Sequence, residues 1–324
     1  MNKTPYNGLR VILAEPRSSL RKEYLDVLKS LGCRDIIETG NIKDVHTALE
    51  EGGVDVLIGD ATIPEGDMSE LVHQIRHGFI GDNPFLIAMV MVSQSDKELI
   101  GRVIDSGADD ILLKPLDTEH LRSRLLSFTS ARKSFVVTSE YIGPDRQKKE
   151  RQDGEKMPLL KVPNPLLVRM GGRHGSGVMK RAVDRTMNVV NKQKVERHAF
   201  TIHWLMERLS AVQNGDLPAG ELNMDEQLKR LNEVARDLTY RLEKTDYRHA
   251  AEMCMTLEKM TLYMSETPEL AGKEEITLLG KLTQVIKRKC SNDSPFAEAS
   301  TISSPEGKIG EPDPSTEAIT AIPS

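Results

Sequence analysis

Two hydrophobic patterns alternate along residues 8–130. Short runs that are almost entirely apolar or β-branched occur at Arg10–Ala14, Ile36–Thr39, Val54–Gly59, Phe85–Val92 and Ile111–Leu113. Such runs are typical of strands buried on both faces of a parallel sheet. The segments between them carry apolar residues at helical spacing, as at Leu20, Tyr24, Leu28 and Leu31. This alternation predicts an α/β fold, a doubly wound five-stranded parallel sheet with its site at the carboxyl ends of the strands.

The pattern changes after residue 130. Residues 131–176 mix prolines and glycines with many charges, including the basic cluster in DRQKKERQDGEK, and predict a flexible linker. Residues 177–290 carry apolar stripes along four successive helices, which predicts a helical bundle or interaction domain and leaves a homodimer through these helices open. Residues 291–324 are rich in Ser, Pro, Glu and Thr without periodicity and predict a disordered tail.

Composition narrows the class of protein. The net charge of −5 gives no general attraction to nucleic acid, and no helix-turn-helix spacing is found, so DNA is not an expected partner. Three distant cysteines indicate neither a disulfide framework nor a zinc site. The amino terminus lacks an apolar leader, and the longest apolar run, Phe85–Val92, is too short to span a bilayer. We therefore expect a cytoplasmic protein without membrane insertion.

Chemically informative side chains stand where predicted strands end. Glu15 follows the first strand, Asp60 ends the third, Ser93 ends the fourth and Lys114 ends the fifth. In a doubly wound sheet these ends converge on one crevice. A carboxylate can accept a phosphoryl group when a divalent cation and an ammonium neutralise the phosphoryl oxygens and a hydroxyl bonds one of them. The four residues fit these roles.

The same residues carry a family resemblance. The motifs ILAEP, VDVLIGDATIPEGD, VS and SGADDILLKPL resemble those of the receiver domain of bacterial response regulators, and the resemblance covers residues 8–130, about 40% of the chain. The helical region is not recognised. We expect a receiver domain at residues 8–130, a linker at 131–176, a helical domain at 177–290 and a tail at 291–324.

The resemblance implies a function for each motif residue. Asp60 would be the phosphoacceptor, with Lys114 and Ser93 contacting the phosphate. Glu15, Asp60 and the main-chain carbonyl of Thr62 would hold Mg²⁺. In the family the Lys-Pro bond is usually cis. The protein would be a phosphoacceptor of a two-component phosphorelay rather than an enzyme. A sensor histidine kinase or a phosphotransfer protein would donate the phosphate. The output would be protein–protein contacts, made as the face formed by the fourth helix, the fifth strand and the fifth helix of the receiver changes its contacts with the helical region or with a partner.

Three positions depart from the family pattern. Pro16 stands where the family has a second acid, which removes one metal contact and predicts weakened Mg²⁺ binding. Ile111 occupies the usual aromatic switch position, and Gln94 follows Ser93 where a small residue is common. These departures keep two alternatives open. One is a degenerate, phosphate-independent receiver that acts as a binding module. The other is a DNA-binding regulator that uses basic positions of the helical region, such as Lys180 and Arg185.

Two weaker motifs favour plain structural interpretations. The loop Gly172–Gly177 has the glycine spacing of a phosphate loop but lacks its Lys and Ser/Thr, so we interpret it as a lead-in to the first long helix. His198 and His203 are five residues apart and do not share a helix face as metal ligands would, so we interpret them as packing or surface residues.

Overall fold

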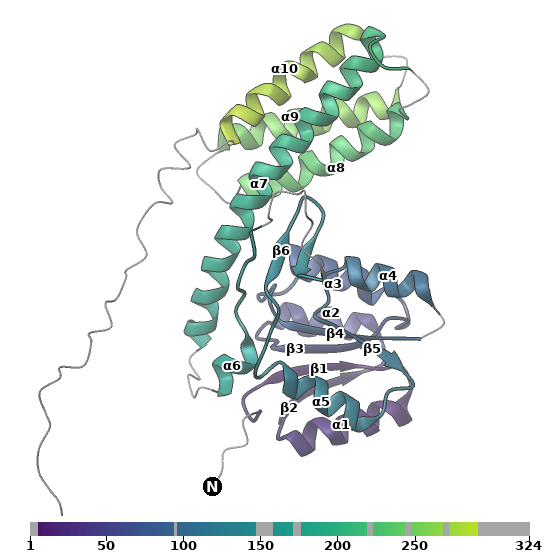
Figure 1. Cartoon of the computed structure of the whole chain (residues 1–324), viewed down its shortest axis with the longest axis vertical. Coiled ribbons are helices and arrows are strands. Elements are labelled where there is room, and N and C mark those ends of the chain that lie inside the picture. The colour runs from purple at the N-terminus through teal and green to yellow at the C-terminus, as the bar shows by residue number, and fades with distance from the viewer. Residues whose placement is uncertain are drawn as a thin grey trace, which may run out of the picture.

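The computed structural model describes residues 6–93, 96–146, 158–170, 176–218, 223–243, 248–267 and 272–290. Helices flank both faces of a sheet in the N-terminal part, and a bundle of long helices lies beyond it (Figure 1). The strands are β1 Arg10–Ala14, β2 Asp35–Thr39, β3 Val56–Asp60, β4 Ile87–Ser93, β5 Asp110–Lys114, β6 Phe135–Val137 and β7 Ile142–Pro144. The helices are α1 Ser18–Leu31, α2 Ile42–Glu51, α3 Met68–His77, α4 Lys97–Asp105, α5 Thr118–Ser127, α6 Pro165–Met170, α7 Ser176–Asn214, α8 Met224–Leu242, α9 Arg248–Glu266 and α10 Lys273–Cys290.

The main sheet has the strand order β2-β1-β3-β4-β5, and every pair of neighbours is parallel. This confirms the predicted five-stranded parallel sheet. Alternate strand residues enter two cores: Val11 and Leu13 pack with α1 and α5, whereas Ile12 and Ala14 pack with α2, α3 and α4. Because all five strands run the same way, their carboxyl ends meet at one edge of the sheet.

Helix α3 has well-defined ends. The Asp67 carboxylate accepts a hydrogen bond from the Ser69 amide at 2.7 Å and caps its first turn. Gly78, with a φ of 75°, ends it in a left-handed conformation. The helix therefore runs along one face of the sheet, from the loop that follows Asp60 to the edge at which the strands begin.

The predicted flexible linker is wrong for residues 131–146 and 158–170, here called the extension. β6 and β7 form an antiparallel hairpin, and Phe135, Val137 and Ile142 are buried. Strands of three residues are too short to show an apolar period, which is why the sequence pattern did not reveal them. Residues 147–157 and 171–175 of the predicted linker lie outside the described residues, as do the phosphate-loop-like glycines at 172 and 175 and the predicted tail at 291–324.

A buried ion cluster attaches the extension to the N-terminal domain. Arg76 of α3 donates to Asp109 Oδ2 at 2.7 Å, and Arg132 of the extension donates to Asp109 Oδ1 at 2.9 Å. Both guanidinium groups also lie over the Phe135 ring, at 5.3 and 5.1 Å. Burial would raise the pKa of Asp109, but Arg132 and Arg76 hold it below its usual value. We call these three charged residues the Asp109 clasp.

Helix α7 passes from one hydrophobic core to another. Its first half places Met179, Val183 and Val190 in a cluster with Phe85 and Phe135. From Val195 onward its buried residues belong to the core of the bundle with α8, α9 and α10. The four helices that the apolar spacing predicts are present, but the first begins against the N-terminal domain rather than beyond a linker. No helix in the described ranges is long and apolar enough to cross a membrane.

Gly107 tests the contact between the N-terminal domain and the hairpin. Its φ is 85°, and a Cβ there would collide with the Ile142 carbonyl oxygen. We expect Gly107→Ala to destabilise the chain by about 2 kcal/mol or more, through strained backbone and overpacking. The measurement is the urea concentration at the unfolding midpoint.

The matched control is Gly101→Ala. Gly101 lies in α4, and apart from its chain neighbours and the nearby backbone of its own helix no described atom lies within 4 Å of the new Cβ. This change should be neutral or stabilising by up to about 1 kcal/mol. Equal midpoints for the two variants would contradict the packing of Gly107 against the hairpin.

Candidate functional site

The ends of β1, β3 and β5 bring three charged side chains together. Lys114 Nζ donates to Glu15 Oε2 at 3.0 Å and is also paired with Asp60 Oδ2. Both carboxylates are buried, with Glu15 0% and Asp60 5% exposed. Two buried acids beside one ammonium form a compact site on which a phosphoryl group could be held.

Asp60 has a second set of contacts. The amide and the hydroxyl of Thr62 both donate to Asp60 Oδ1, at 2.9 and 3.0 Å. Burial alone would raise the pKa of Asp60, but the Lys114 ammonium and the Thr62 donors hold it below its usual value. Asp60 is therefore ionised at neutral pH, which is the form that acts as a nucleophile.

Ser93 ends β4 and stands opposite Lys114 in the β4–β5 register. It is exposed, at the same edge of the sheet as the other predicted site residues. The Lys114-Pro115 bond is cis, as the family resemblance implies. Gln94 lies outside the described residues.

The sequence analysis missed two arginines at this site. The amide and Nε of Arg17 donate to Glu15 Oε1 at 3.1 and 3.3 Å. Arg21 donates to the Glu15 carbonyl oxygen at 2.6 Å. They follow Glu15 and Pro16 closely in the chain, so their position beside the acid could have suggested this role. With Arg17 and Lys114, the two buried carboxylates face two cations.

The residues present provide a small donor set for Mg²⁺. In the described part of the chain, no group of three or more His, Cys, Asp or Glu side chains could hold a metal ion. Mg²⁺ keeps several waters and often uses only one or two carboxylates, so Glu15, Asp60 and a carbonyl such as that of Thr62 suit it. Pro16 contributes no carboxylate, and Lys114 and Arg17 engage both acids.

His198 and His203 do not form a common site. His198 is 2% exposed, and its Nε2 lies 2.6 Å from Asp237 Oδ2 in the bundle. The His203 Nε2 lies 3.2 Å from Glu207 Oε1 on the same helix. Both positions agree with packing or surface roles for these histidines.

Comparison with known proteins places the N-terminal domain in a family. Residues 11–126 match the model of the response regulator receiver domain. The chain is 25% identical over 134 residues to a cyclic di-GMP phosphodiesterase of Thermotoga maritima, covering 41% of this chain and 34% of that protein. It is 26% identical over 115 residues to the transcriptional regulatory protein KdpE of Staphylococcus aureus, covering 36% of this chain and 48% of that protein.

A solved structure, that of the chemotaxis response regulator CheY4 of Vibrio cholerae, is 19% identical with a TM-score of 0.33, and covers 37% of this chain and 97% of that one. Of the two curated relatives, the phosphodiesterase and the transcriptional regulatory protein, the chain covers at most about half the length. The five-stranded parallel sheet agrees with the fold of a receiver domain. Residues 11–126 are a response regulator receiver domain.

The metal site can be tested at Pro16, which stands where the family has a second acid. We expect Pro16→Asp to lower the dissociation constant for Mg²⁺ about tenfold, because it returns a carboxylate ligand beside Glu15. Pro16→Asn has nearly the same shape without the charge and should leave the dissociation constant close to that of the unaltered chain. Mg²⁺ titration followed by backbone NMR shifts near Asp60 measures both. An equal gain from Asn and Asp would show that the proline ring, and not the missing charge, limits binding.

Proposed function

We propose that this protein is a response-regulator-like member of a two-component phosphorelay in the cytoplasm. It accepts phosphate on Asp60 from a sensor histidine kinase or a phosphotransfer protein, and it signals through protein contacts rather than by catalysing a reaction of its own. The meeting of the Asp60 and Glu15 carboxylates with the Lys114 ammonium carries this proposal. Phosphoryl acceptance by a carboxylate needs this combination of nucleophile and positive charge.

The chemistry follows from the contacts of Asp60. A carboxylate oxygen of Asp60 forms a bond to phosphorus while the phosphorus–nitrogen bond of the donor phosphohistidine breaks, and the released imidazole takes up a proton. Lys114 shifts from the carboxylates to a phosphoryl oxygen, and the Ser93 hydroxyl donates to another. Mg²⁺, when bound by Glu15, Asp60 and the Thr62 carbonyl, supplies further neutralisation of phosphoryl charge.

Helix α3 is the route by which the site would influence the helical region. Its N-terminus follows the Asp60 loop, and the Gly78 carbonyl at its other end accepts a hydrogen bond from the Tyr240 hydroxyl of α8 at 2.8 Å. The hairpin adds two further contacts: Lys194 donates to the Ser139 carbonyl at 2.6 Å, and Arg230 pairs with Glu140 at 2.7 Å. A displacement of α3 on phosphorylation would therefore reach the bundle directly.

This route differs from part of the expectation drawn from the sequence. That expectation was for the α4–β5–α5 face to change its contacts with the helical region or with a partner. The contacts just described run instead through α3 and the hairpin. On the α4–β5–α5 side, Leu113 is 43% exposed and Ile111 is half-buried, which supports a role for that face in binding a separate protein.

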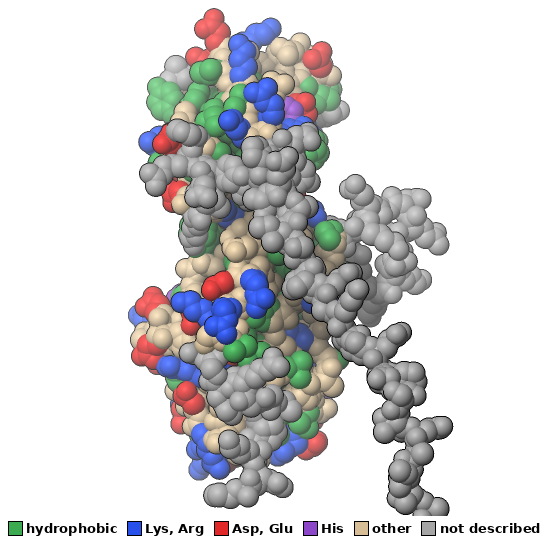
Figure 2. All heavy atoms as spheres, turned by 90° about the vertical axis from the view of Figure 1, so that its left-hand side faces the viewer, with side chains coloured by type: hydrophobic (Ala, Val, Ile, Leu, Met, Phe, Trp, Pro, Cys, Tyr) green, Lys and Arg blue, Asp and Glu red, His purple; other side chains and the backbone are tan. Residues whose placement is uncertain are grey.

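A phosphate-independent binding module is the second candidate. Its support is the loss of the second acid at Pro16 together with Arg17, which pairs with Glu15. The DNA-binding alternative gains no comparable support. On the face shown in Figure 2, Lys and Arg side chains are interspersed with Asp and Glu over both the receiver and the bundle.

The assignment of Asp60 is tested by labelling. Incubation of the full chain with radiolabelled acetyl phosphate and Mg²⁺ should label the unaltered protein, whereas Asp60→Asn should reduce the label by at least about a hundredfold, because the nucleophile is removed. Asp105→Asn is the matched control, since Asp105 is an exposed acid at the end of α4. It should label normally.

Label that persists on Asp60→Asn would refute the assignment of the acceptor. An unlabelled wild-type chain, under conditions that label another receiver, would instead favour the phosphate-independent module.

A further inference from the structure

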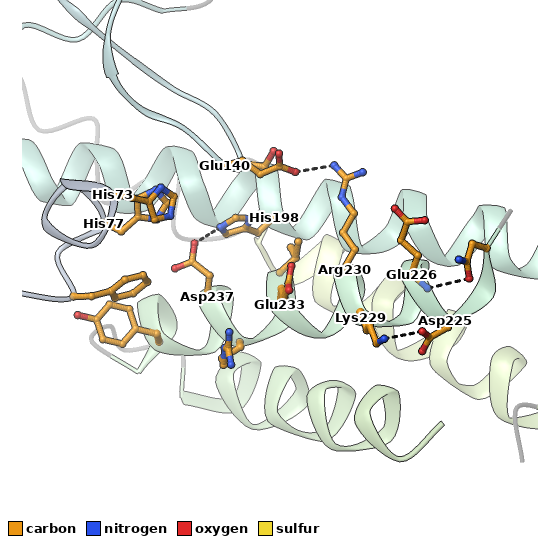
Figure 3. A pocket seen from close by; sticks show the side chains of 16 residues that line it. His73, His77, Glu140, His198, Asp225, Glu226, Lys229, Arg230, Glu233 and Asp237 are labelled. Carbon is orange, nitrogen blue, oxygen red and sulfur yellow. Dashed lines mark hydrogen bonds and ion pairs between the residues drawn. The ribbon is translucent and has the colours of Figure 1, made fainter. Parts of the chain in front are cut away.

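A cleft of about 1090 Å³ lies between the receiver and the bundle. Its walls come from α3, the turn between β6 and β7, α7 and α8 (Figure 3). It lies at the end of α3 away from Asp60, so it is separate from the phosphoacceptor site. Its volume is at the upper limit of sites that bind small molecules, about 300–1,000 Å³.

One wall of the cleft is aromatic. The rings of His73 and His77 are stacked, with centroids 4.0 Å apart and an angle of 27° between their planes. The row of rings continues with Phe79, whose ring centroid lies 5.7 Å from that of His77 and 5.1 Å from that of Tyr240. All four side chains line the cleft, so the receiver and α8 together offer ring faces and edges to a planar ligand.

Two imidazole nitrogens in the wall have no hydrogen-bond partner among the described residues. They are Nε2 of His77 and Nδ1 of His198, on rings that are 4% and 2% exposed. The other nitrogen of His198 faces the Asp237 carboxylate at 2.6 Å and therefore carries the proton. Nδ1 of His198 is then a buried acceptor, and a ligand N–H group would satisfy it.

Both rings are neutral at physiological pH. Burial, Lys194 and His73 lower the pKa of His77 to about 2. Burial also lowers the pKa of His198, although Asp237 opposes the shift. A neutral imidazole has one donor and one acceptor nitrogen, whereas an imidazolium ring would offer only protons. At His198 the contact with Asp237 makes Nδ1 the acceptor.

The remaining charges around the cleft argue against an anionic ligand. Acidic side chains outnumber basic ones: Glu140, Asp225, Glu226, Glu233 and Asp237 stand against Lys229, Arg230 and Arg236. Asp225 and Glu140 are paired with Lys229 and Arg230 at 2.7 Å each. Asp237 is paired in turn with Arg241 and Lys194 behind the wall, at 3.0 and 3.8 Å. The charges around the cleft are thus largely balanced, which gives no general attraction for an anion and suits an uncharged or weakly cationic molecule.

We propose that this cleft binds a planar, amino-substituted heteroaromatic molecule of the nucleobase class, uncharged or cationic, which stacks on the aromatic wall, donates an N–H group to Nδ1 of His198 and forms a hydrogen bond with Nε2 of His77. Such a ligand contacts α3 of the receiver and α8 of the bundle at the same time. Its binding stabilises their contact and gives the protein a second input beside Asp60.

The test uses the full chain with histidine ring carbons labelled for NMR. Adenosine, guanosine and cytidine are added separately, up to about 5 mM, a range that detects millimolar affinity. At least one of them should shift the His77 and His198 resonances, while those of His46 and His120, which lie elsewhere on the receiver, stay in place. If adenosine binds, purine riboside, which lacks only the amino group, and adenosine 5′-monophosphate, which adds negative charge, should each bind at least about tenfold more weakly.

Substitutions locate the binding. His77→Phe keeps a buried aromatic ring but removes Nε2, and His73→Ala shortens the stacked wall; each should weaken the bound nucleoside at least about tenfold. His203→Phe is the matched control, because His203 lies on α7 beside Glu207 and does not line the cleft. It should leave affinity unchanged, and circular dichroism confirms that each variant is folded.

Three results would overturn the proposal. One is the absence of histidine shifts with all three nucleosides. Another is equal affinity for adenosine and purine riboside when adenosine is the ligand that binds. The last is an equal loss from His203→Phe and His77→Phe. None of these readouts depends on phosphorylation, so they can fail while the phosphoacceptor role of Asp60 stands.

Discussion

The carboxylate of Asp109 holds the two parts of the chain in their observed arrangement. It receives guanidinium groups from α3 and from the extension, and all three side chains are nearly inaccessible to solvent. Removing one member of such a buried ion cluster leaves an unpaired charge in a low-dielectric interior, which costs about 3–5 kcal/mol. The hairpin, the first half of α7 and hence the cleft all depend on this attachment.

The two proposed sites lie at opposite ends of one short helix, α3. At the carboxyl edge of the sheet, Lys114 bridges Glu15 and Asp60. At the far end of α3, Gly78 and Phe79 meet Tyr240 of the bundle. Arg76, which belongs to the Asp109 clasp, lies in the last turn of α3, so a displacement of α3 would disturb the clasp. Coupling between the Asp60 site and the bundle would thus require only one rigid element, α3, with contacts at both of its ends.

Most of the receiver fold could be predicted from the sequence, because its apolar residues recur at the spacing of strands and helices. Nearly continuous apolar strands and the positions of Asp60 and Lys114 at strand ends are visible without coordinates, and the parallel topology makes those ends converge. The four long helices were predictable for the same reason. The extension was not, because its strands have three residues each and its core combines Phe135 with buried arginines, which resemble solvent-exposed charges in a sequence.

The site was predicted less completely than the fold. Arg17 pairs with the Glu15 carboxylate and Arg21 donates to the Glu15 main-chain carbonyl, through local loop geometry that residue types alone do not specify. The cleft was also invisible, because His73, His77, His198 and Tyr240 come from segments up to 167 positions apart, and only the docking of α8 on α3 assembles them. Interfaces between domains are harder to read from sequence than cores, since they lack a repeating pattern.

Hydrogen–deuterium exchange of the full chain, before and after phosphorylation confirmed by intact mass, tests most directly whether Asp60 communicates with the helical region. Coupling along α3 predicts altered exchange in the C-terminal turn of α3, the β6–β7 hairpin and α8, with little change in α1. A phosphorylated chain whose exchange is unchanged in those three segments would contradict it.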